Sequence, residues 1–191
     1  MKKPLSEMSL EELWQLFPIQ LTEYKPIWND WFSEEKNYLS SLLPQNCLIH
    51  HIGSTSIKGI WAKPIIDLLI EANLSDFSKI KTALLNQGYL CMKESPSRMD
   101  FNKGYTESGF FEKVFHLHLR TFGDHDELFF RDYLLKYPKI AKEYEKLKLS
   151  LWKPYEFNRD GYTEMKTAFV QEITQKAKEE YGLNHFKRRK K

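Results

Sequence analysis

The sequence predicts an α+β fold in which helices flank a mixed β-sheet and a helical segment ends the chain. Three observations support this fold class. Of the 191 residues, 41% are hydrophobic and 15% aromatic, which is enough apolar surface for a buried core and excludes a disordered chain. Apolar runs typical of strands alternate with helical periodicity up to residue 123, and only helical periodicity follows. No linker or internal repeat divides the chain, so one domain is the simplest interpretation.

The N-terminal part of the chain is predicted to hold two helices with a short strand between them. Ser9 and Glu12 have the spacing of a capping box, which predicts a helix that begins after Ser9. Residues 19–22 alternate between apolar and polar side chains, as a strand does. From residue 26 to residue 43 the apolar side chains recur every three or four positions, so we expect a long amphipathic helix there.

Two apolar runs, residues 47–52 and 64–70, predict the first strands of the sheet. The second run is nearly continuous and rich in Ile and Leu, as in a central strand that is buried on both faces. The elements that follow are predicted in this order: a helix over residues 75–87, strands over 89–93, 99–105 and 110–120, a helix capped by Asp124 and broken at Pro138, a second helix directly after it, and a last helix that begins at Thr163.

The positive charge of the chain is concentrated at its C-terminus. The formal net charge is +3, but residues 187–191 hold five of the 29 basic residues and leave 24 basic against 26 acidic ones, a charge of −2. A general polyanion-binding surface is therefore not indicated. We predict one domain over residues 1–183 and a basic, disordered tail over residues 184–191, with nucleic acid bound only weakly and only through that tail.

The cysteines and the hydropathy pattern indicate where the protein resides. Cys47 and Cys91 lie far apart in apolar runs, as reduced and partly buried thiols do. The N-terminus lacks the apolar stretch of a signal peptide, and no run of about 18 apolar residues is long enough to span a membrane. We expect a cytoplasmic protein without membrane association.

A turn of small and hydroxyl residues follows the first predicted strand, and an aspartate lies inside the second. Gly53 lets the backbone approach a phosphate closely, and Ser54 and Thr55 supply N–H groups and hydroxyls as donors. Asp67 lies in an apolar strand, where a carboxylate is costly unless it is paired or binds a cation. The pattern predicts a site for a nucleoside triphosphate or another phosphorylated small molecule, with Mg²⁺ or Mn²⁺ at Asp67. The alternative, a tight turn beside an aspartate that its neighbours satisfy, stays open here.

A second polar group lies in the last predicted strand, where His116, His118 and Arg120 share one face. Two imidazoles at this spacing can ligate one metal ion, so His118 is a candidate metal ligand together with Asp67. Both histidines are also candidates for proton transfer, and with Asp67 they are the candidate catalytic residues. Arg120 is a candidate phosphate ligand. The alternative is two histidines that are packed and hydrogen-bonded at a strand surface.

Further basic residues lie near the turn. Lys63, directly before the second strand, is a candidate phosphate ligand, and so is Lys58. For both, the alternative is a solvated surface lysine. Arg131 and Lys166, on the C-terminal helices, are candidates to close over the pocket, although we expect them to be solvated charges on the helix surface. His51, beside the turn, is the other histidine that we expect near the site.

Several stretches of the chain, taken together, resemble the GrpB-like proteins. They are residues 24–28, 51–56, 62–67, 116–119, 130–134 and 162–166, within a resemblance that spans residues 19–177. The family is assigned to the nucleotidyltransferase superfamily, and its members occur alone or fused behind dephospho-CoA kinase. The resemblance therefore implies a nucleotidyltransferase-like fold, with a candidate pocket at Gly53, Ser54, Lys63, Asp67, His116 and His118.

The sequence departs from the superfamily pattern at one chemically important position. Leu69 stands where the superfamily has its second carboxylate, and Glu71 lies about 7 Å further along a strand. Two-metal transfer needs carboxylates that bridge ions about 3.5–4 Å apart. Two hypotheses follow: metal-dependent nucleotidyl transfer from a nucleoside triphosphate to an unknown acceptor, or a nucleotide-binding or partner-binding module that does not catalyse transfer.

Overall fold

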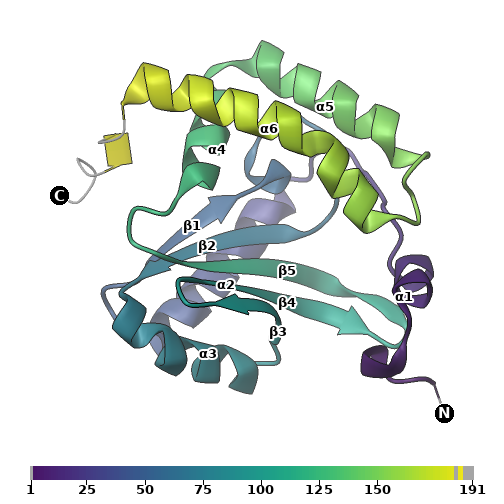
Figure 1. Ribbon diagram of the computed structural model, residues 1–191, viewed down its shortest axis with the longest axis vertical. Helices are drawn as coiled ribbons and strands as arrows, with labels where there is room; N and C mark the ends of the chain where they lie inside the picture. Colours follow the sequence, from purple (N-terminus) through teal and green to yellow (C-terminus); the bar gives the residue numbers. More distant parts are fainter. Residues whose placement is uncertain (1, 183–184, 187–191) are drawn as a thin grey trace.

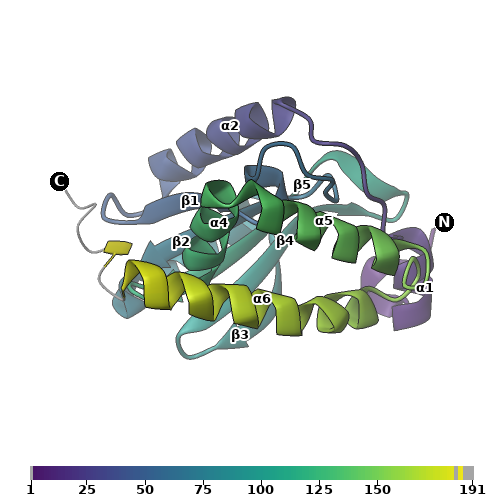
Figure 2. The same cartoon turned by 90° about the horizontal axis from the view of Figure 1, so that it is seen from above.

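One mixed β-sheet runs through the middle of the molecule, and helices cover both of its faces (Figures 1 and 2). The computed structural model describes residues 2–182 and 185–186. Within this part of the chain the strands are β1 (Leu48–Ile52), β2 (Ile66–Ala72), β3 (Leu90–Ser95), β4 (Arg98–Thr106) and β5 (Gly109–Thr121). The α-helices are α1 (Leu10–Leu16), α2 (Ile27–Leu42), α3 (Phe77–Asn86), α4 (Asp126–Lys136), α5 (Pro138–Trp152) and α6 (Arg159–Tyr181). The predicted α+β class, with a mixed sheet flanked by helices and a helical C-terminal segment, is confirmed.

The strand order of the sheet is β1-β2-β5-β4-β3. Strands β2 and β5 are parallel, and every other neighbouring pair is antiparallel. In the parallel pair Asp67 lies opposite His116, and Leu69 lies opposite His118. Because alternate residues of a strand point to the same side, Asp67, His116 and His118 share one face of the sheet. The crossover from β2 to β5 thus joins the two polar groups that the sequence places far apart.

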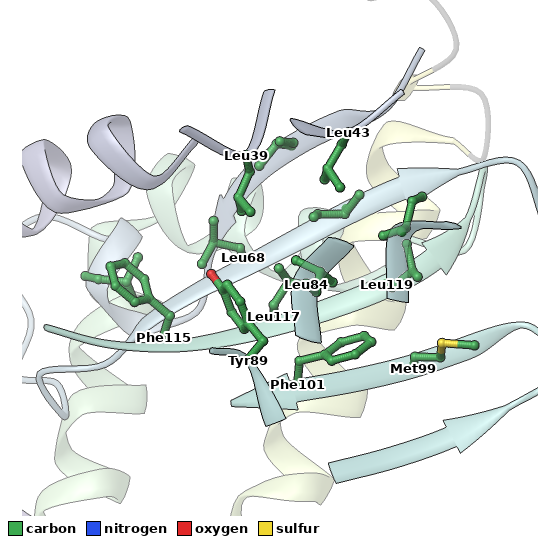
Figure 3. Packing of buried hydrophobic residues seen from close by; sticks show 14 of the residues in the cluster. Leu39, Leu43, Leu68, Leu84, Tyr89, Met99, Phe101, Phe115, Leu117 and Leu119 are labelled. Carbon is green, nitrogen blue, oxygen red and sulfur yellow. The ribbon is translucent and has the colours of Figure 1, made fainter. Parts of the chain in front are cut away.

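The other face of the sheet packs against α2 and α3 and forms the main core (Figure 3). Leu68 of β2 and Leu117 of β5 are fully buried there, together with Leu39 of α2 and Leu84 of α3. Burial of each such side chain stabilises the fold by about 1.5–3 kcal/mol. The two faces of β2 are both covered, as its nearly continuous apolar sequence predicts.

Helices α4, α5 and α6 cover the face that carries Asp67 (Figure 2). Ile52 and Leu69 of the sheet pack there against Leu128 of α4. Helix α6 packs along both α4 and α5, with Ile173 in the cluster that they share. The polar residues of β2 and β5 therefore lie between the sheet and a layer of helices from the C-terminal third of the chain. We call this layer, α4, α5 and α6, the helical roof.

The predicted strand at residues 19–22 is wrong. Only Thr22 makes a bridge, to Ala62, and the segment binds the connection between α5 and α6 instead of a sheet strand. The N–H of Ile19 donates to the carbonyl oxygen of Glu156, and the indole N–H of Trp152 donates to the carbonyl of Ile19. The backbone groups that a strand would use are therefore taken by the helical connection.

Two predicted helix starts are also wrong. Helix α6 begins at Arg159 and not at Thr163, because the Asn158 side chain accepts the N–H of Gly161 and caps the helix earlier. Asp124 does not cap α4, since its carboxylate binds the Arg98 guanidinium at 2.5 and 2.6 Å. The predicted capping box at Ser9 is confirmed.

Within the described residues, no helix combines the length and the apolar composition that crossing a bilayer requires. Both cysteines are free thiols of intermediate burial, as the sequence predicts. Of the predicted tail, residues 184 and 187–191 lie outside the described residues. Phe186 is described, and its ring contacts the rings of His125 and Phe129.

Candidate functional site

The turn after β1 lies directly beneath Asp67. Gly53 has a φ of +68°, which turns the chain into a short 3₁₀ segment, Ser54–Ser56. Ile52, the last residue of β1, pairs with Asp67 across the antiparallel ladder. The register therefore brings the predicted phosphate turn and the predicted acidic residue into direct contact.

A chain of hydrogen bonds fixes Asp67 and defines the protonation of His116. Arg159 Nη2 donates to the hydroxyl of Tyr105 at 2.9 Å, and this hydroxyl lies 2.7 Å from His116 Nε2. The Tyr105 hydroxyl can donate its proton to His116 Nε2, whereas the Asp67 carboxylate beside the other ring nitrogen can only accept, which assigns the ring proton to Nδ1. This nitrogen lies 3.4 Å from Asp67 Oδ1. His116 is therefore a neutral imidazole that donates to the carboxylate.

The pKa values of this pair agree with that assignment. Burial lowers the pKa of His116, against the attraction of Asp67. Burial alone would raise the pKa of Asp67, but the hydrogen bond from His116 and the nearby basic groups, Lys63 among them, outweigh it and hold the pKa below its usual value. Asp67 is thus an ionised carboxylate at neutral pH.

No second carboxylate joins Asp67. Leu69 is fully buried and packs among apolar side chains. The Glu71 carboxylate is bound by His50 Nε2 at 3.0 Å, by His125 Nδ1 at 2.8 Å and by the N–H of Gly123 at 2.9 Å. Burial would raise the pKa of Glu71, but these hydrogen bonds outweigh it and lower the pKa strongly. In the described part of the chain, no group of three or more His, Cys, Asp or Glu side chains is arranged to hold a metal ion.

His118 and Arg120 are both bound to Asp100, a residue of β4. His118 Nδ1 lies 2.9 Å and Arg120 Nη2 lies 2.7 Å from the same oxygen of Asp100. Arg120 Nη1 donates to the carbonyls of Met99 and Leu119, and only 6% of the residue is exposed. Its guanidinium therefore holds the strands and Asp100 in place and does not face an open phosphate site.

Thr55 and His51 support the turn from within the protein. The Thr55 hydroxyl donates to the carbonyl of Ile65 and lies 3.1 Å from His51 Nε2, so this nitrogen donates to it. The His51 ring stacks on Phe32, and burial lowers its pKa to about 4. The Thr55 hydroxyl is consequently used to brace the turn.

A cavity of about 160 Å³ lies above the turn and collects three lysines. Lys63 comes from the segment before β2, Lys148 from α5 and Lys166 from α6. Lys148 Nζ donates to Ser54 Oγ at 3.0 Å and to the carbonyl of Trp61. We call this cavity, with Gly53, Ser54, Lys63, Asp67, Lys148 and Lys166 in its wall, the lysine pocket.

In the free protein, the surroundings of the lysine pocket disfavour the charged forms of its three lysines. Burial, and then the charge of Lys166, lowers the pKa of Lys148 to about 7. Burial also lowers the pKa of Lys166 to about 8 and that of Lys63 well below its usual value. The ammonium groups of Lys63 and Lys166 lie 5.6 and 4.2 Å from the ring of Tyr162, whose buried hydroxyl has no hydrogen-bond partner in the described structure. Asp67 is the carboxylate that opposes them, so an added anion would favour the charged forms.

A second, more open cavity of about 640 Å³ adjoins the lysine pocket. Both cavities are lined by Gly53, Asp67 and Tyr144, so they form one continuous depression. The larger cavity extends between the sheet and α6 and reaches His118 and Thr174. A ligand with its phosphates among the lysines therefore has space for a larger organic part beside them.

The comparison with known proteins shows which family the chain belongs to. Residues 18–176 match the family described as GrpB protein. The chain belongs to the GrpB family. Glutamate-rich protein GrpB from Alkalihalophilus pseudofirmus is 35% identical over 161 residues, which is 80% of this chain and 92% of that protein. UPF0157 protein YqkA from Bacillus subtilis is 32% identical over 177 residues, 88% of this chain and 51% of YqkA, so the chain spans about half the length of that relative.

A solved GrpB structure agrees with the membership in the GrpB family. The crystal structure of the conserved protein GrpB from Enterococcus faecalis has a TM-score of 0.74 and 34% identity, and the match covers 85% of this chain and 99% of that one. The Cid1 poly(U) polymerase with bound MgGTP is more distant, with a TM-score of 0.43 and 14% identity over 73% of this chain and 44% of Cid1.

The structure brings together most of the candidate site residues that the sequence singles out. Those that line the lysine pocket are Gly53, Ser54, Thr55, Lys63, Asp67 and His116. His118 lies in the adjoining cavity, and the side chains of Thr55 and Arg120 are engaged elsewhere. Lys58 is exposed and does not line the pocket.

The residues that sequence reasoning missed in this GrpB-family protein come from the helical roof and from β4. Lys166 is half-buried in the pocket wall, so the expectation of a solvated surface charge is wrong and the alternative, closure over the pocket, agrees with the structure. Lys148, Tyr105, Arg159 and Asp100 were not considered. A signal for both lysines exists in the sequence, since each interrupts an otherwise apolar helical stripe. The stripe of α5 is Ala141, Tyr144, Lys148 and Leu151, and that of α6 is Tyr162, Lys166, Phe169 and Ile173.

Proposed function

We propose that this GrpB-family protein binds a phosphorylated small molecule, with a nucleoside triphosphate as the first candidate, and holds its phosphates in the lysine pocket. One observation supports the proposal above all: a buried lysine, Lys148, and two half-buried ones, Lys63 and Lys166, line the cavity at the Gly53 turn. Asp67 is the carboxylate that attracts Lys63 and Lys166. Buried cations without matching anions are costly for a protein to keep. A phosphate ligand supplies the missing negative charge.

The arrangement of donors suits a phosphate. The turn has a glycine at its first position and the Ser54 hydroxyl at its second, and Lys148 already donates to that hydroxyl. The adjoining cavity offers space and apolar walls, such as Phe130 and Val170, for the organic part of the ligand. A nucleotide combines these two requirements, a charged end and a larger partly apolar body.

Binding is favoured over transfer because the acidic residues are so few at the pocket. Leu69 fills the position of the second carboxylate, and Glu71 is committed to His50, His125 and Gly123. The carboxylates that would bridge two metal ions are therefore not assembled around Asp67. Nucleotide binding without transfer is therefore the first of the two functions that we propose.

Nucleotidyl transfer is a second candidate, and one specific observation favours it. His118 opens into the larger cavity while Asp100 holds its Nδ1 at 2.9 Å. An imidazole that is oriented by a carboxylate is the usual arrangement of a general base. Such a base would deprotonate an acceptor hydroxyl placed beside the bound triphosphate.

Isothermal titration calorimetry with the four ribonucleoside triphosphates and with inorganic tripolyphosphate tests the binding proposal. We expect Lys148→Met to weaken binding at least about tenfold, because a charged hydrogen bond is worth about 1.5–3 kcal/mol. Lys146→Met, at an exposed position of the same helix, is the matched control and should bind as the wild type does. The absence of binding for every one of these anions would overturn the proposal.

Product analysis separates the second candidate from the first. Labelled triphosphates are incubated with the protein, Mg²⁺ or Mn²⁺, and a panel of hydroxyl-bearing acceptors, and pyrophosphate release is followed. Transfer would release pyrophosphate and form a labelled product. His118→Ala and Asp100→Asn should reduce the amount of each without weakening triphosphate binding. Tight binding without pyrophosphate release under any condition would support nucleotide binding and rule out nucleotidyl transfer.

A further inference from the structure

The charges around Asp67 are the reverse of those in a divalent cation site. Magnesium in proteins is held by carboxylates, with substrate phosphates and water completing the shell. Here one carboxylate faces the ammonium groups of Lys63 and Lys166, and the guanidinium of Arg159 is close enough to lower the pKa of both lysines. A divalent cation at Asp67 would be repelled by all three.

The other carboxylates of this sheet face are already engaged and cannot complete a metal shell. Glu71 is bound by two histidines and a backbone N–H, and Asp100 is bound by His118 and Arg120. On α5, Glu145 accepts from the N–H of Trp61 and pairs with Lys142. Asp67 itself accepts a hydrogen bond from Nδ1–H of His116. The donor set of this chain therefore does not fit the Mg²⁺ or Mn²⁺ that the sequence pattern predicts.

We propose that the lysine pocket binds its polyphosphate without a divalent cation, and that the ammonium groups of Lys63, Lys148 and Lys166 neutralise the phosphates in place of a metal ion. This inference rests on the proposed function, because it concerns the same ligand in the same pocket. The three lysines come from three separate segments, so they surround the cavity and do not form a single patch. The ligand class is consequently one with two or more adjacent phosphate charges.

Asp67 has a different role in this proposal from the one that the sequence indicates. Its carboxylate is the resident anion of the pocket and attracts Lys63 and Lys166 in the free protein. It repels an incoming phosphate at the same time. Removing its charge should therefore leave polyphosphate binding intact or strengthen it, whereas a metal-mediated site would lose binding.

The test is calorimetric titration of inorganic tripolyphosphate and ATP, each in EDTA and in excess Mg²⁺. For the wild type we expect binding in EDTA that is as tight as in Mg²⁺ or tighter. Asp67→Asn, which keeps the shape of the side chain, should bind equally or several-fold more tightly in EDTA. Lys166→Met should lose at least about tenfold in the same buffer. Asp30→Asn, at an exposed position of α2, is the control for a change of net charge.

The outcomes distinguish this inference from the function on which it rests. Binding that appears only with Mg²⁺ and disappears in Asp67→Asn would overturn the metal-free inference and keep the proposed function. No binding in either buffer would overturn the proposed function itself. Thermal melting of each variant establishes that it is folded, and the wild-type comparison of EDTA with Mg²⁺ decides the question even if Asp67→Asn does not fold.

Discussion

A Cβ atom on residue 53 would lie 2.2 Å from Oδ2 of Asp67 and less than 3 Å from its Cβ and Cγ. Real Cβ atoms do not approach other atoms this closely, so the aspartate lies where only a glycine leaves room for it. The positive φ of Gly53 adds a second requirement for glycine at this position. The turn and the carboxylate are thus one structural unit.

Gly53→Ala should displace Asp67 and abolish tripolyphosphate binding. The left-handed backbone alone costs an alanine about 1–3 kcal/mol, and the clash adds to it. Gly59→Ala is the matched control, because Gly59 has a φ of +86° but nothing within 4 Å of an added Cβ. Chemical denaturation and calorimetry of both variants check this prediction, and an equal loss of stability and binding in the two would contradict it.

Polyphosphate affinity should fall as the pH rises from 7 to 9. In the free protein the pKa of Lys148 is about 7 and that of Lys166 about 8, with Glu145, Lys142 and Lys166 as the charges around Lys148. A bound anion raises both lysine pKa values, so above pH 7 binding must take up protons. The affinity should drop by up to about tenfold per pH unit for each lysine involved.

Calorimetry at pH 8 in buffers of different ionisation enthalpy measures this uptake directly. We expect net proton uptake in the wild type and a smaller uptake in Lys166→Met. Proton release, or an affinity that rises with pH over this range, would contradict the prediction.

Lys166→Met should stabilise the protein without ligand by about 1–2 kcal/mol at pH 7, because it removes a charge that burial penalises. A lysine with a lowered pKa destabilises the fold below that pKa, and the penalty vanishes as the pH rises toward the pKa of an unfolded lysine. The gain should therefore be largest below pH 8 and shrink by pH 10. Urea denaturation over this range, with Lys146→Met as the exposed control, measures it.

His116 should be the neutral Nδ1–H tautomer at pH 7. The prediction follows from the Asp67 carboxylate, which can only accept from Nδ1, and from the Tyr105 hydroxyl, which can donate to Nε2. Long-range ¹H–¹⁵N NMR spectra report which ring nitrogen is protonated. Tyr105→Phe should weaken the preference and destabilise the protein by about 1–3 kcal/mol, since Arg159 and His116 each lose a partner. A protonated Nε2 in the wild type would show that the assignment is wrong.

Glu71→Gln should destabilise the protein by about 2–3 kcal/mol at pH 7, because three hydrogen bonds end on this buried carboxylate. The pKa of Glu71 is lowered in the folded state, so its stabilisation is present above the unfolded pKa of about 4.3 and is lost as the pH falls further. The difference between wild type and Glu71→Gln should consequently narrow below pH 4. Glu143→Gln, exposed on α5, should show no such difference.

The parts of the fold and site that depend on short stretches of sequence could be predicted. The Gly53 turn, the buried strand with Asp67 and the shared face of His116 and His118 all follow from spacing within one segment. The turn also meets Asp67 because the connection between β1 and β2 is short enough for the two strands to pair. These features need no knowledge of how distant segments pack.

The rest depends on packing between distant segments. Arg120 does share a face with the histidines, but the register of β4 beside β5 places Asp100 against it. Gly104 marks the shift in that pairing, as a glycine inside a strand does, but it does not say which residues of the two strands lie side by side. Lys148 and Lys166 interrupt apolar stripes, which places them on the inward side of their helices but does not say what they face. Their role requires the position of the helical roof over the sheet.

The contact of Lys148 with Ser54 joins residues that are 94 positions apart in the chain. Forming it has to close a long loop, which is entropically unfavourable and slow compared with local structure. The pocket should therefore be complete only when the last two helices have docked, late in folding. A ligand held between the turn and these helices would act as a reversible cross-link between the two halves of the chain, so its concentration would set the stability of the whole fold rather than that of one loop.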